Sequence, residues 1–147
     1  MLRFTKHERE EATTISNEQK DPSLGLNENS GFLRHNGIRV ISAEAEHSVL
    51  KADITAGSRN IWGNVHGGLI YTMADTAAGA MARAAGKKNS TLNASISYLR
   101  PAADVDELYA YGSATKAGRS TGVYQVSIRT ADGVELAVAQ VTMFFLE

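Results

Sequence analysis

A histidine, two glycines and one aspartate lie close together in the stretch NIWGNVHGGLIYTMADTAAGAMARAAG, residues 60–86. Glycines at a helix start let a ligand approach the backbone closely, and the first amide N–H groups of a helix have no intrahelical acceptor. The helix dipole strengthens those donors. His66-Gly67-Gly68 could therefore stabilise an oxygen that becomes negative during a reaction at a carbonyl group.

Asp75 is the only acidic residue of this stretch. It lies about two helical turns beyond the glycines, roughly 10–12 Å from the helix start at 1.5 Å per residue. A carboxylate of the same chain is too far away to attack a carbonyl held at those amides. Asp75 therefore has another role, or a partner chain supplies one half of each site. This geometry favours a dimer.

A simpler interpretation must be weighed for both features. His-Gly-Gly is a common tripeptide, and an aspartate in a helix is usually solvated or a cap. The residues around Asp75, however, offer few exposed positions. A buried carboxylate needs partners or a function.

The run 67–85 has the spacing of an α-helix. Its larger apolar residues follow three-and-four spacing, and Gly86 followed by two lysines is typical of a helix end. Small residues occupy much of the other side, so the helix is apolar nearly all round and we expect it to be central and buried. The larger apolar residues are Leu69, Ile70, Met73, Ala77, Ala80, Met81 and Ala84, and the small ones are Ala74, Ala78, Gly79 and Ala82.

The rest of the chain beyond residue 37 predicts β-strands. Alternating stretches cover residues 38–43 and 48–54 before the helix, and 93–101, 106–119 and 120–146 after it. Asp132-Gly133 divides the last stretch into a hairpin. Without further helices to connect them, these strands should be antiparallel. We therefore predict an α+β fold in which a curved antiparallel sheet wraps around one long helix.

The first thirty residues are polar and poor in β-branched apolar residues. We expect an N-terminal arm over residues 1–30, mobile or with a short charged helix from about Thr5. Asp21-Pro22 and the cluster 27–31 predict breaks, and a short helix is expected at 32–36. The folded domain should cover residues 31–147.

Composition excludes several classes of protein. The chain has 147 residues, is 43% hydrophobic and carries a net charge of −1, which gives no basis for binding nucleic acid or an anionic membrane. It contains no cysteine, so disulfides, thiolate zinc sites and cysteine nucleophiles are excluded. We find no signal-peptide pattern and no apolar run that could span a bilayer. We expect a soluble, cytoplasmic protein.

The pattern Asn60-x5-His66-Gly67-Gly68-x6-Asp75, with Ala74 and Gly79 around the aspartate, resembles the hotdog-fold acyl-CoA thioesterases of the phenylacetic-acid-degradation (PaaI-like) type. The resemblance covers residues 32–146, including the strand SISYLRPA and the hairpin KAGRSTGVYQVSI. It implies six antiparallel strands around one helix. It also implies a homodimer with one continuous sheet and composite active sites, and pairing of such dimers into a homotetramer.

The resemblance also implies roles for individual residues. Asp75 matches the catalytic carboxylate, acting as general base on water or as nucleophile, and Gly67 matches the backbone N–H that polarises the thioester carbonyl. Asn60 matches the loop asparagine that faces the aspartate across the dimer interface. His66 matches the motif histidine, more often an orienter of that loop than a proton shuttle. Thr91 falls where relatives carry a hydroxyl that holds the attacking water.

Substrate binding is implied at Gly68, beside the helix start, and at Lys116, Arg119 and Thr121, where relatives contact coenzyme A. The expected partner is an acyl-CoA. No metal or separate cofactor is implied, since coenzyme A is part of the substrate. Trp62 and Tyr71 could line the acyl pocket or pack at the interface.

Two other functions remain open. One is a hotdog hydratase or dehydratase, which uses other aspartate–histidine or histidine–glutamate arrangements. The other is a non-catalytic acyl-CoA-binding module. Within the thioesterase interpretation, aryl, hydroxyaryl and medium-chain acyl groups are all compatible with the sequence.

Overall fold

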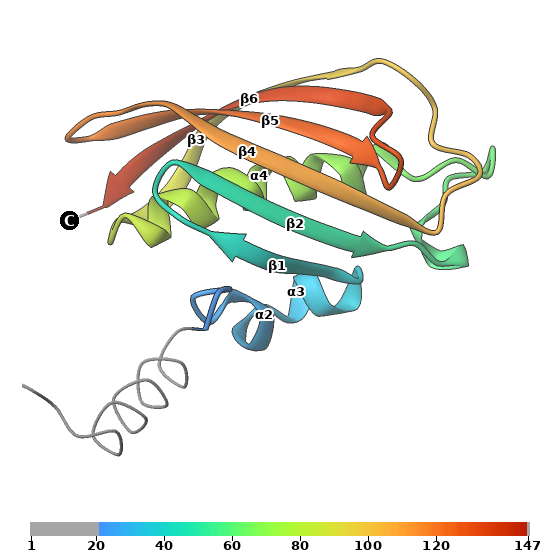
Figure 1. The fold of residues 1–147 in the computed structure, drawn as a ribbon, viewed down its shortest axis with the longest axis horizontal. Helices are drawn as coiled ribbons and strands as arrows, with labels where there is room; N and C mark the ends of the chain where they lie inside the picture. Colours follow the sequence, from blue (N-terminus) through green and yellow to red (C-terminus); the bar gives the residue numbers. More distant parts are fainter. Residues whose placement is uncertain (1–20, 147) are drawn as a thin grey trace, which may run out of the picture.

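One long helix and a six-stranded antiparallel sheet form the core of the structure, a computed structural model that describes residues 21–146 (Figure 1). The helix predicted near Thr5 falls outside the described residues. The strands are β1 (Ile38–Ala43), β2 (His47–Asp53), β3 (Lys88–Tyr98), β4 (Glu107–Ala117), β5 (Thr121–Thr130) and β6 (Glu135–Leu146). The helices are α2 (Leu26–Asn29), α3 (Gly31–His35), the 3-10 turn η1 (Ala56–Ser58) and the long α4 (Gly67–Ala84). The predicted α+β hotdog fold is confirmed.

The strand order places β3 at one edge of the sheet. The order is β1-β2-β4-β5-β6-β3, and every neighbouring pair is antiparallel. β3 begins at Lys88, five residues before the predicted start, because residues 88–92 pair with the end of β6 without showing an alternating apolar pattern. A long strand with one unpaired edge readily pairs with another strand.

Helix α4 packs against the concave face of the sheet and contacts all six strands. Small residues allow close approach. A side chain at Gly112 of β4 would meet the Met81 methyl group and the Ser48 hydroxyl at 2.5 Å. Ser48 is itself buried and donates to the Ala77 carbonyl at 3.0 Å. The prediction that other backbones pass close to this helix is therefore confirmed.

One stripe of α4 is not covered by the sheet. It contains Gly68, Tyr71, Thr72, Asp75, Thr76, Gly79 and Arg83, which are all partly or fully exposed. The prediction of burial nearly all round is thus wrong along this stripe in the single chain. Gly79 and the threonines have small or short side chains that do not identify an exposed face by hydropathy.

The segment 21–36 lies against β1 (Figure 1). The break predicted within 27–31 is present at Ser30, whose extended backbone separates α2 from α3, although the residues on either side of it are helical. The side chain of Asn27 donates to the Val40 carbonyl at 2.9 Å and accepts from the Val40 N–H at 2.7 Å. An asparagine that satisfies the edge of β1 can look like a turn residue in the sequence. The short helix predicted at 32–36 is present as α3.

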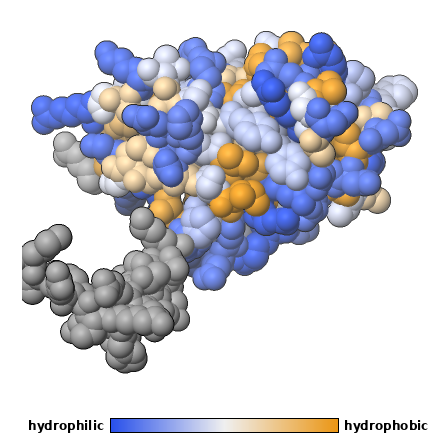
Figure 2. Space-filling model, in the orientation of Figure 1, coloured by the Kyte–Doolittle hydropathy of each residue, from blue (hydrophilic) through white to orange (hydrophobic). Residues whose placement is uncertain are grey.

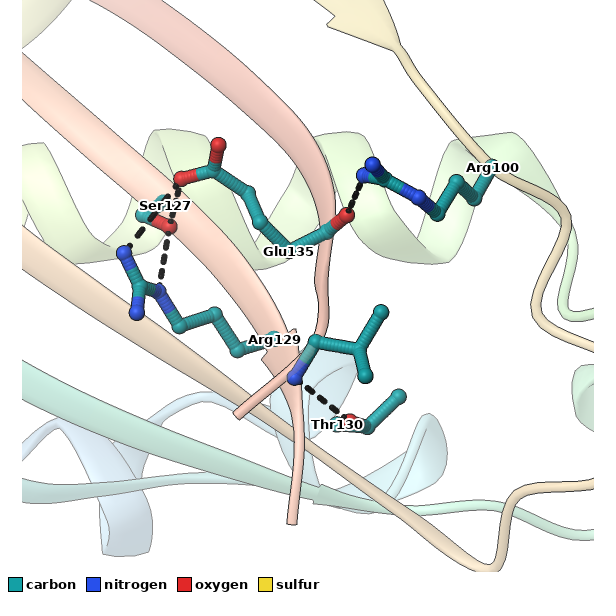
Figure 3. Close-up of polar contacts among 6 residues, drawn as sticks. Arg100, Ser127, Arg129, Thr130 and Glu135 are labelled. Atoms are coloured by element: carbon teal, nitrogen blue, oxygen red, sulfur yellow. Dashed lines mark hydrogen bonds and ion pairs between the residues drawn. The ribbon is translucent and has the colours of Figure 1, made fainter. Parts of the chain in front are cut away.

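Polar contacts fix the β5–β6 hairpin and the end of β3 (Figure 3). Ser127 donates to the Glu135 carboxylate at 2.6 Å and accepts from Arg129 at 2.9 Å. From the end of β3, Arg100 donates to the Glu135 carbonyl at 2.6 Å. Thr130 accepts from the Val134 N–H at 3.0 Å, closing the predicted Asp-Gly turn. These contacts hold the chain leaving β3 against β6.

An exposed charge network links β1, β2 and β4. Lys51 donates to Glu107 at 2.8 Å and Arg39 donates to Asp53 at 2.8 Å. These hydrogen bonds hold the pKa of Glu107 and the pKa of Asp53 below their ordinary values. A carboxyl whose pKa is lower in the folded than in the unfolded protein raises the free energy of unfolding at pH values above its unfolded pKa. This stabilisation is lost as the pH falls through the folded-state pKa.

We therefore expect Glu107→Gln to flatten the acid side of the stability profile. Urea unfolding midpoints at about pH 7 and about pH 3 should differ less for the variant than for the wild type. Glu44→Gln, on the β1–β2 turn outside this network, is the control and should leave the difference unchanged. If the unfolding midpoint falls by the same amount between about pH 7 and about pH 3 in wild type and in Glu107→Gln, Glu107 does not contribute to the acid sensitivity.

On the face shown in Figure 2, hydrophobic residues form separate patches among hydrophilic ones. Within residues 21–146, none of the helices combines the length and the hydropathy needed to cross a bilayer.

Candidate active site

Asp75 lines a cavity of about 570 Å³ beside the uncovered stripe of α4. The Thr91 hydroxyl of β3 donates to Asp75 Oδ1 at 2.5 Å. Phe32 and Leu33 of α3 line another part of the cavity, together with Tyr71. The carboxylate is partly buried, with one oxygen held by β3 and its surroundings open to a ligand.

The start of α4 is shaped by His66, which is its N-cap. The His66 Nδ1 accepts from the Gly68 N–H at 2.8 Å, and the His66 N–H donates to the Ser58 carbonyl at 2.8 Å. In a neutral imidazole this arrangement places the proton on Nε2. Of the two glycine amides, Gly68 is therefore engaged by the cap. Gly67 N–H has no acceptor among residues 21–146 and is available to a ligand.

Asn60 organises the loop that leads to the helix. Its side-chain Oδ1 accepts from the Trp62 N–H at 3.0 Å and from the Asn64 N–H at 3.1 Å. The Asn60 N–H donates to the Asn64 carbonyl at 2.8 Å. Because Oδ1 is engaged within the loop, the Nδ2 group is the part of this side chain that can donate to a ligand.

Tyr98, at the end of β3, covers the start of α4. Its hydroxyl donates to the Gly67 carbonyl at 2.8 Å, and its ring lies 3.3 Å from the place of a side chain at residue 67. Burial, and then Tyr71, raise the pKa of Tyr98, so the phenol remains a neutral donor. Asn60, Gly67 and Tyr98 line a cavity of about 300 Å³. Sequence reasoning missed Tyr98 because its contact joins residues 31 positions apart.

The predicted site residues thus form two half-sites in one chain. Asp75 and Thr91 share one cavity, whereas Asn60 and Gly67 share the other. We call these the carboxylate half-site and the amide half-site.

The remaining predicted binding residues lie elsewhere. Lys116, Arg119 and Thr121 lie at the exposed β4–β5 turn and are not among the residues that line the two half-sites. Of the two aromatic residues near the helix start, Tyr71 lines the carboxylate half-site, and Trp62 is 80% exposed on the loop.

Comparison with known proteins gives the family. Residues 63–137 match the model of the thioesterase superfamily. The acyl-coenzyme A thioesterase PaaI of Escherichia coli (strain K12) is 31% identical over 101 residues, which are 69% of this chain and 72% of that protein. The chain belongs to the thioesterase superfamily. It is therefore a thioester hydrolase of the PaaI-like hotdog type.

Solved structures agree with this thioesterase in fold. The structure of the E. coli PaaI protein from the phenylacetic acid degradation operon has a TM-score of 0.79 and 26% identity, covering 86% of this chain and 91% of that one. A hypothetical thioesterase with coenzyme A from Streptococcus pneumoniae TIGR4 has a TM-score of 0.70 and 30% identity, covering 74% of this chain and 85% of that one.

Proposed function

We propose that this thioesterase hydrolyses acyl-CoA thioesters to a free acid and coenzyme A at sites completed by a homodimer. The observation that carries the proposal is the division of the site. The carboxylate half-site holds Asp75 with its Thr91 donor, and the amide half-site holds the available Gly67 N–H. Each half-site alone lacks a group that thioester hydrolysis needs.

Pairing of two β3 edges would bring complementary half-sites together. Thr91, near the start of β3, contacts the Asp75 carboxylate, and Tyr98, at its end, contacts Gly67. When two copies of a strand pair antiparallel about a two-fold axis, the start of one lies beside the end of the other. The carboxylate half-site of one protomer then meets the amide half-site of its partner. We further expect two dimers to form a tetramer, which light scattering after size exclusion would measure.

In this dimer the thioester carbonyl oxygen accepts a hydrogen bond from Gly67 N–H at the positive end of α4, which stabilises the tetrahedral oxyanion. Asn60 Nδ2 positions the thioester or the water, and His66 fixes the glycine turn. Asp75 of the other protomer removes a proton from water as the water oxygen attacks, or attacks the carbonyl carbon directly. The carbon–sulfur bond then breaks and the coenzyme A thiolate leaves. When Asp75 is the nucleophile, this step leaves the acyl group on its carboxylate as an anhydride, which water then hydrolyses to the free acid and Asp75. No metal or separate cofactor takes part in these steps.

A single turnover in ¹⁸O-labelled water distinguishes the two roles of Asp75. With a general base, the water oxygen enters the acid product directly. With a nucleophile, water hydrolyses an anhydride between the acyl group and Asp75, and attack at the Asp75 carbonyl carbon leaves the label in the Asp75 side chain and an Asp75 oxygen in the acid product. Label in the Asp75 side chain after one turnover therefore identifies the nucleophile.

Coenzyme A as the thiol is supported by two relatives: the E. coli protein is an acyl-coenzyme A thioesterase, and the S. pneumoniae structure contains coenzyme A. In our proposal Lys116, Arg119 and Thr121 contact the part of coenzyme A outside the half-sites. The lining of the carboxylate half-site is largely polar, but Phe32, Leu33 and Tyr71 give it an apolar part against which an aryl, hydroxyaryl or medium-chain acyl group could pack.

A thiol-release screen over an acyl-CoA panel tests this function. We expect release of coenzyme A from at least one aryl or medium-chain acyl-CoA. Tight coenzyme A binding without release from any member, or hydration of an enoyl-CoA without thiol release, would contradict it.

Thr91→Val should lower kcat about tenfold, because it removes one hydrogen bond to Asp75 while keeping a β-branched side chain on β3. The measurement is kcat with the best substrate of the panel. Thr91→Ser, which keeps the hydroxyl, is the control and should stay within about threefold of wild type. If Thr91→Val and the wild type have equal kcat, the Thr91 hydroxyl has no role in turnover.

A further inference from the structure

The loop 60–64 carries the two most exposed large apolar side chains among the described residues. Ile61 is 90% exposed and Trp62 is 80% exposed. The loop projects at the end of the molecule where β3 joins β4 (Figure 1), immediately before α4. Adjacent exposed apolar side chains of this size are typical of a contact surface.

This loop is held in a fixed shape. Besides the Asn60 contacts, the Arg59 guanidinium donates to the Gly63 carbonyl at 2.9 Å, to the Ala103 carbonyl at 2.5 Å and to the Val105 carbonyl at 2.9 Å. Gly63 has φ of 80°, a left-handed conformation that favours glycine. The fold thus uses several polar contacts to hold Trp62 away from its own core.

The carboxylate half-site exposes apolar side chains that Trp62 could contact. Phe32 of α3 is 64% exposed and Tyr71 of α4 is 39% exposed, and both line the cavity around Asp75. Part of each side chain is therefore open to solvent in the single chain.

We propose that Trp62 of one protomer closes the carboxylate half-site of the other and forms the wall against which the acyl group packs. The inference rests on the proposed dimeric thioesterase. The occupant is a second copy of this chain, because the β3 pairing that joins the half-sites also carries the loop. The loop adjoins Gly67 through Asn60 and His66, so it accompanies the amide half-site to the partner's Asp75. The same two-fold axis supplies a loop and a receiving cavity to both sites.

Trp62→Ala should lower kcat/KM for the best acyl-CoA by about tenfold to a hundredfold and broaden the range of acyl groups accepted. Its exposure in the single chain means that truncation leaves no cavity in the core. Trp62→Phe, which keeps an aromatic wall, should recover most of the activity. Wild-type kcat/KM for Trp62→Ala across the whole panel would overturn the proposal.

A hybrid dimer shows which chain supplies the tryptophan. Trp62→Ala and Asp75→Asn chains with different tags are co-expressed and purified on both tags. A hybrid of wild-type and Asp75→Asn chains, prepared in the same way, is the reference. If Trp62 acts across the interface, the active site of either hybrid combines a normal Asp75 with a normal Trp62, and their kcat/KM values match.

If Trp62 acts within its own chain, the first hybrid is lower by the full Trp62→Ala factor, and the proposal fails. Failure of the proposed function has a different signature, because the wild-type protein itself would then release no thiol from any acyl-CoA of the panel.

Discussion

Asp75→Asn is expected to reduce kcat by about a hundredfold to ten-thousandfold, the usual contribution of a general acid or base. The amide oxygen can still accept from Thr91, so the local geometry that holds residue 75 is retained. What is lost is the negative charge that, in the proposed mechanism, takes the proton from water or attacks the carbonyl. Because residue 75 is partly exposed on the open stripe of α4, the unfolding midpoint should remain close to that of the wild type.

The measurement combines thiol release with thermal unfolding and size exclusion. Asp132→Asn, the same exchange at the β5–β6 turn, is the matched control and should keep full activity. An inactive Asp75→Asn protein with a normal melting temperature and oligomer assigns the loss to chemistry. Turnover at the wild-type rate would refute the mechanism.

The sequence was sufficient for the elements that hold these residues. The apolar spacing of 67–85 predicted α4 to within one residue of its end, and Asp132-Gly133 located the hairpin. The start of β3 was missed because residues 88–92 form an edge strand whose side chains are mostly exposed. Alternation appears in a sequence only where one face of a strand is buried.

The candidate site, like the fold, could be predicted from the sequence only in part. Helix geometry alone separated Asp75 from the glycine amides and favoured two chains. Thr91 came only from the family resemblance, because its hydrogen bond to Asp75 depends on how β3 crosses α4, 16 positions away in sequence. Neither spacing nor resemblance indicated that Asn60 uses its carbonyl oxygen within its own loop. Such contacts depend on tertiary packing, which local patterns do not record.

Leu92→Glu is expected to separate the dimer and lower kcat/KM at nanomolar enzyme by about a hundredfold, because each half-site of a separated chain then lacks the complementary half-site of a partner. Leu92 lies near the middle of β3 and is 62% exposed. In the proposed dimer the two-fold axis passes near the middle of β3, so the two copies of Leu92 lie near each other. The substitution would then remove apolar contact and place two negative charges close together. In the single chain an exposed substitution of this kind should change stability by only about 0.5 kcal/mol.

Ile41→Glu is the control. It also replaces an exposed aliphatic side chain with glutamate, but on β1 at the opposite edge of the sheet, where Ile41 is 41% exposed. It should leave both oligomer and activity unchanged. For Leu92→Glu, raising the protein concentration should restore part of the activity by mass action, together with the larger species seen by light scattering. Activity that depends on concentration in this way distinguishes a divided site from a damaged fold, since an unfolded chain is not rescued by dimerisation. A monomeric Leu92→Glu protein with full activity would place all catalytic groups in one chain and overturn the composite site.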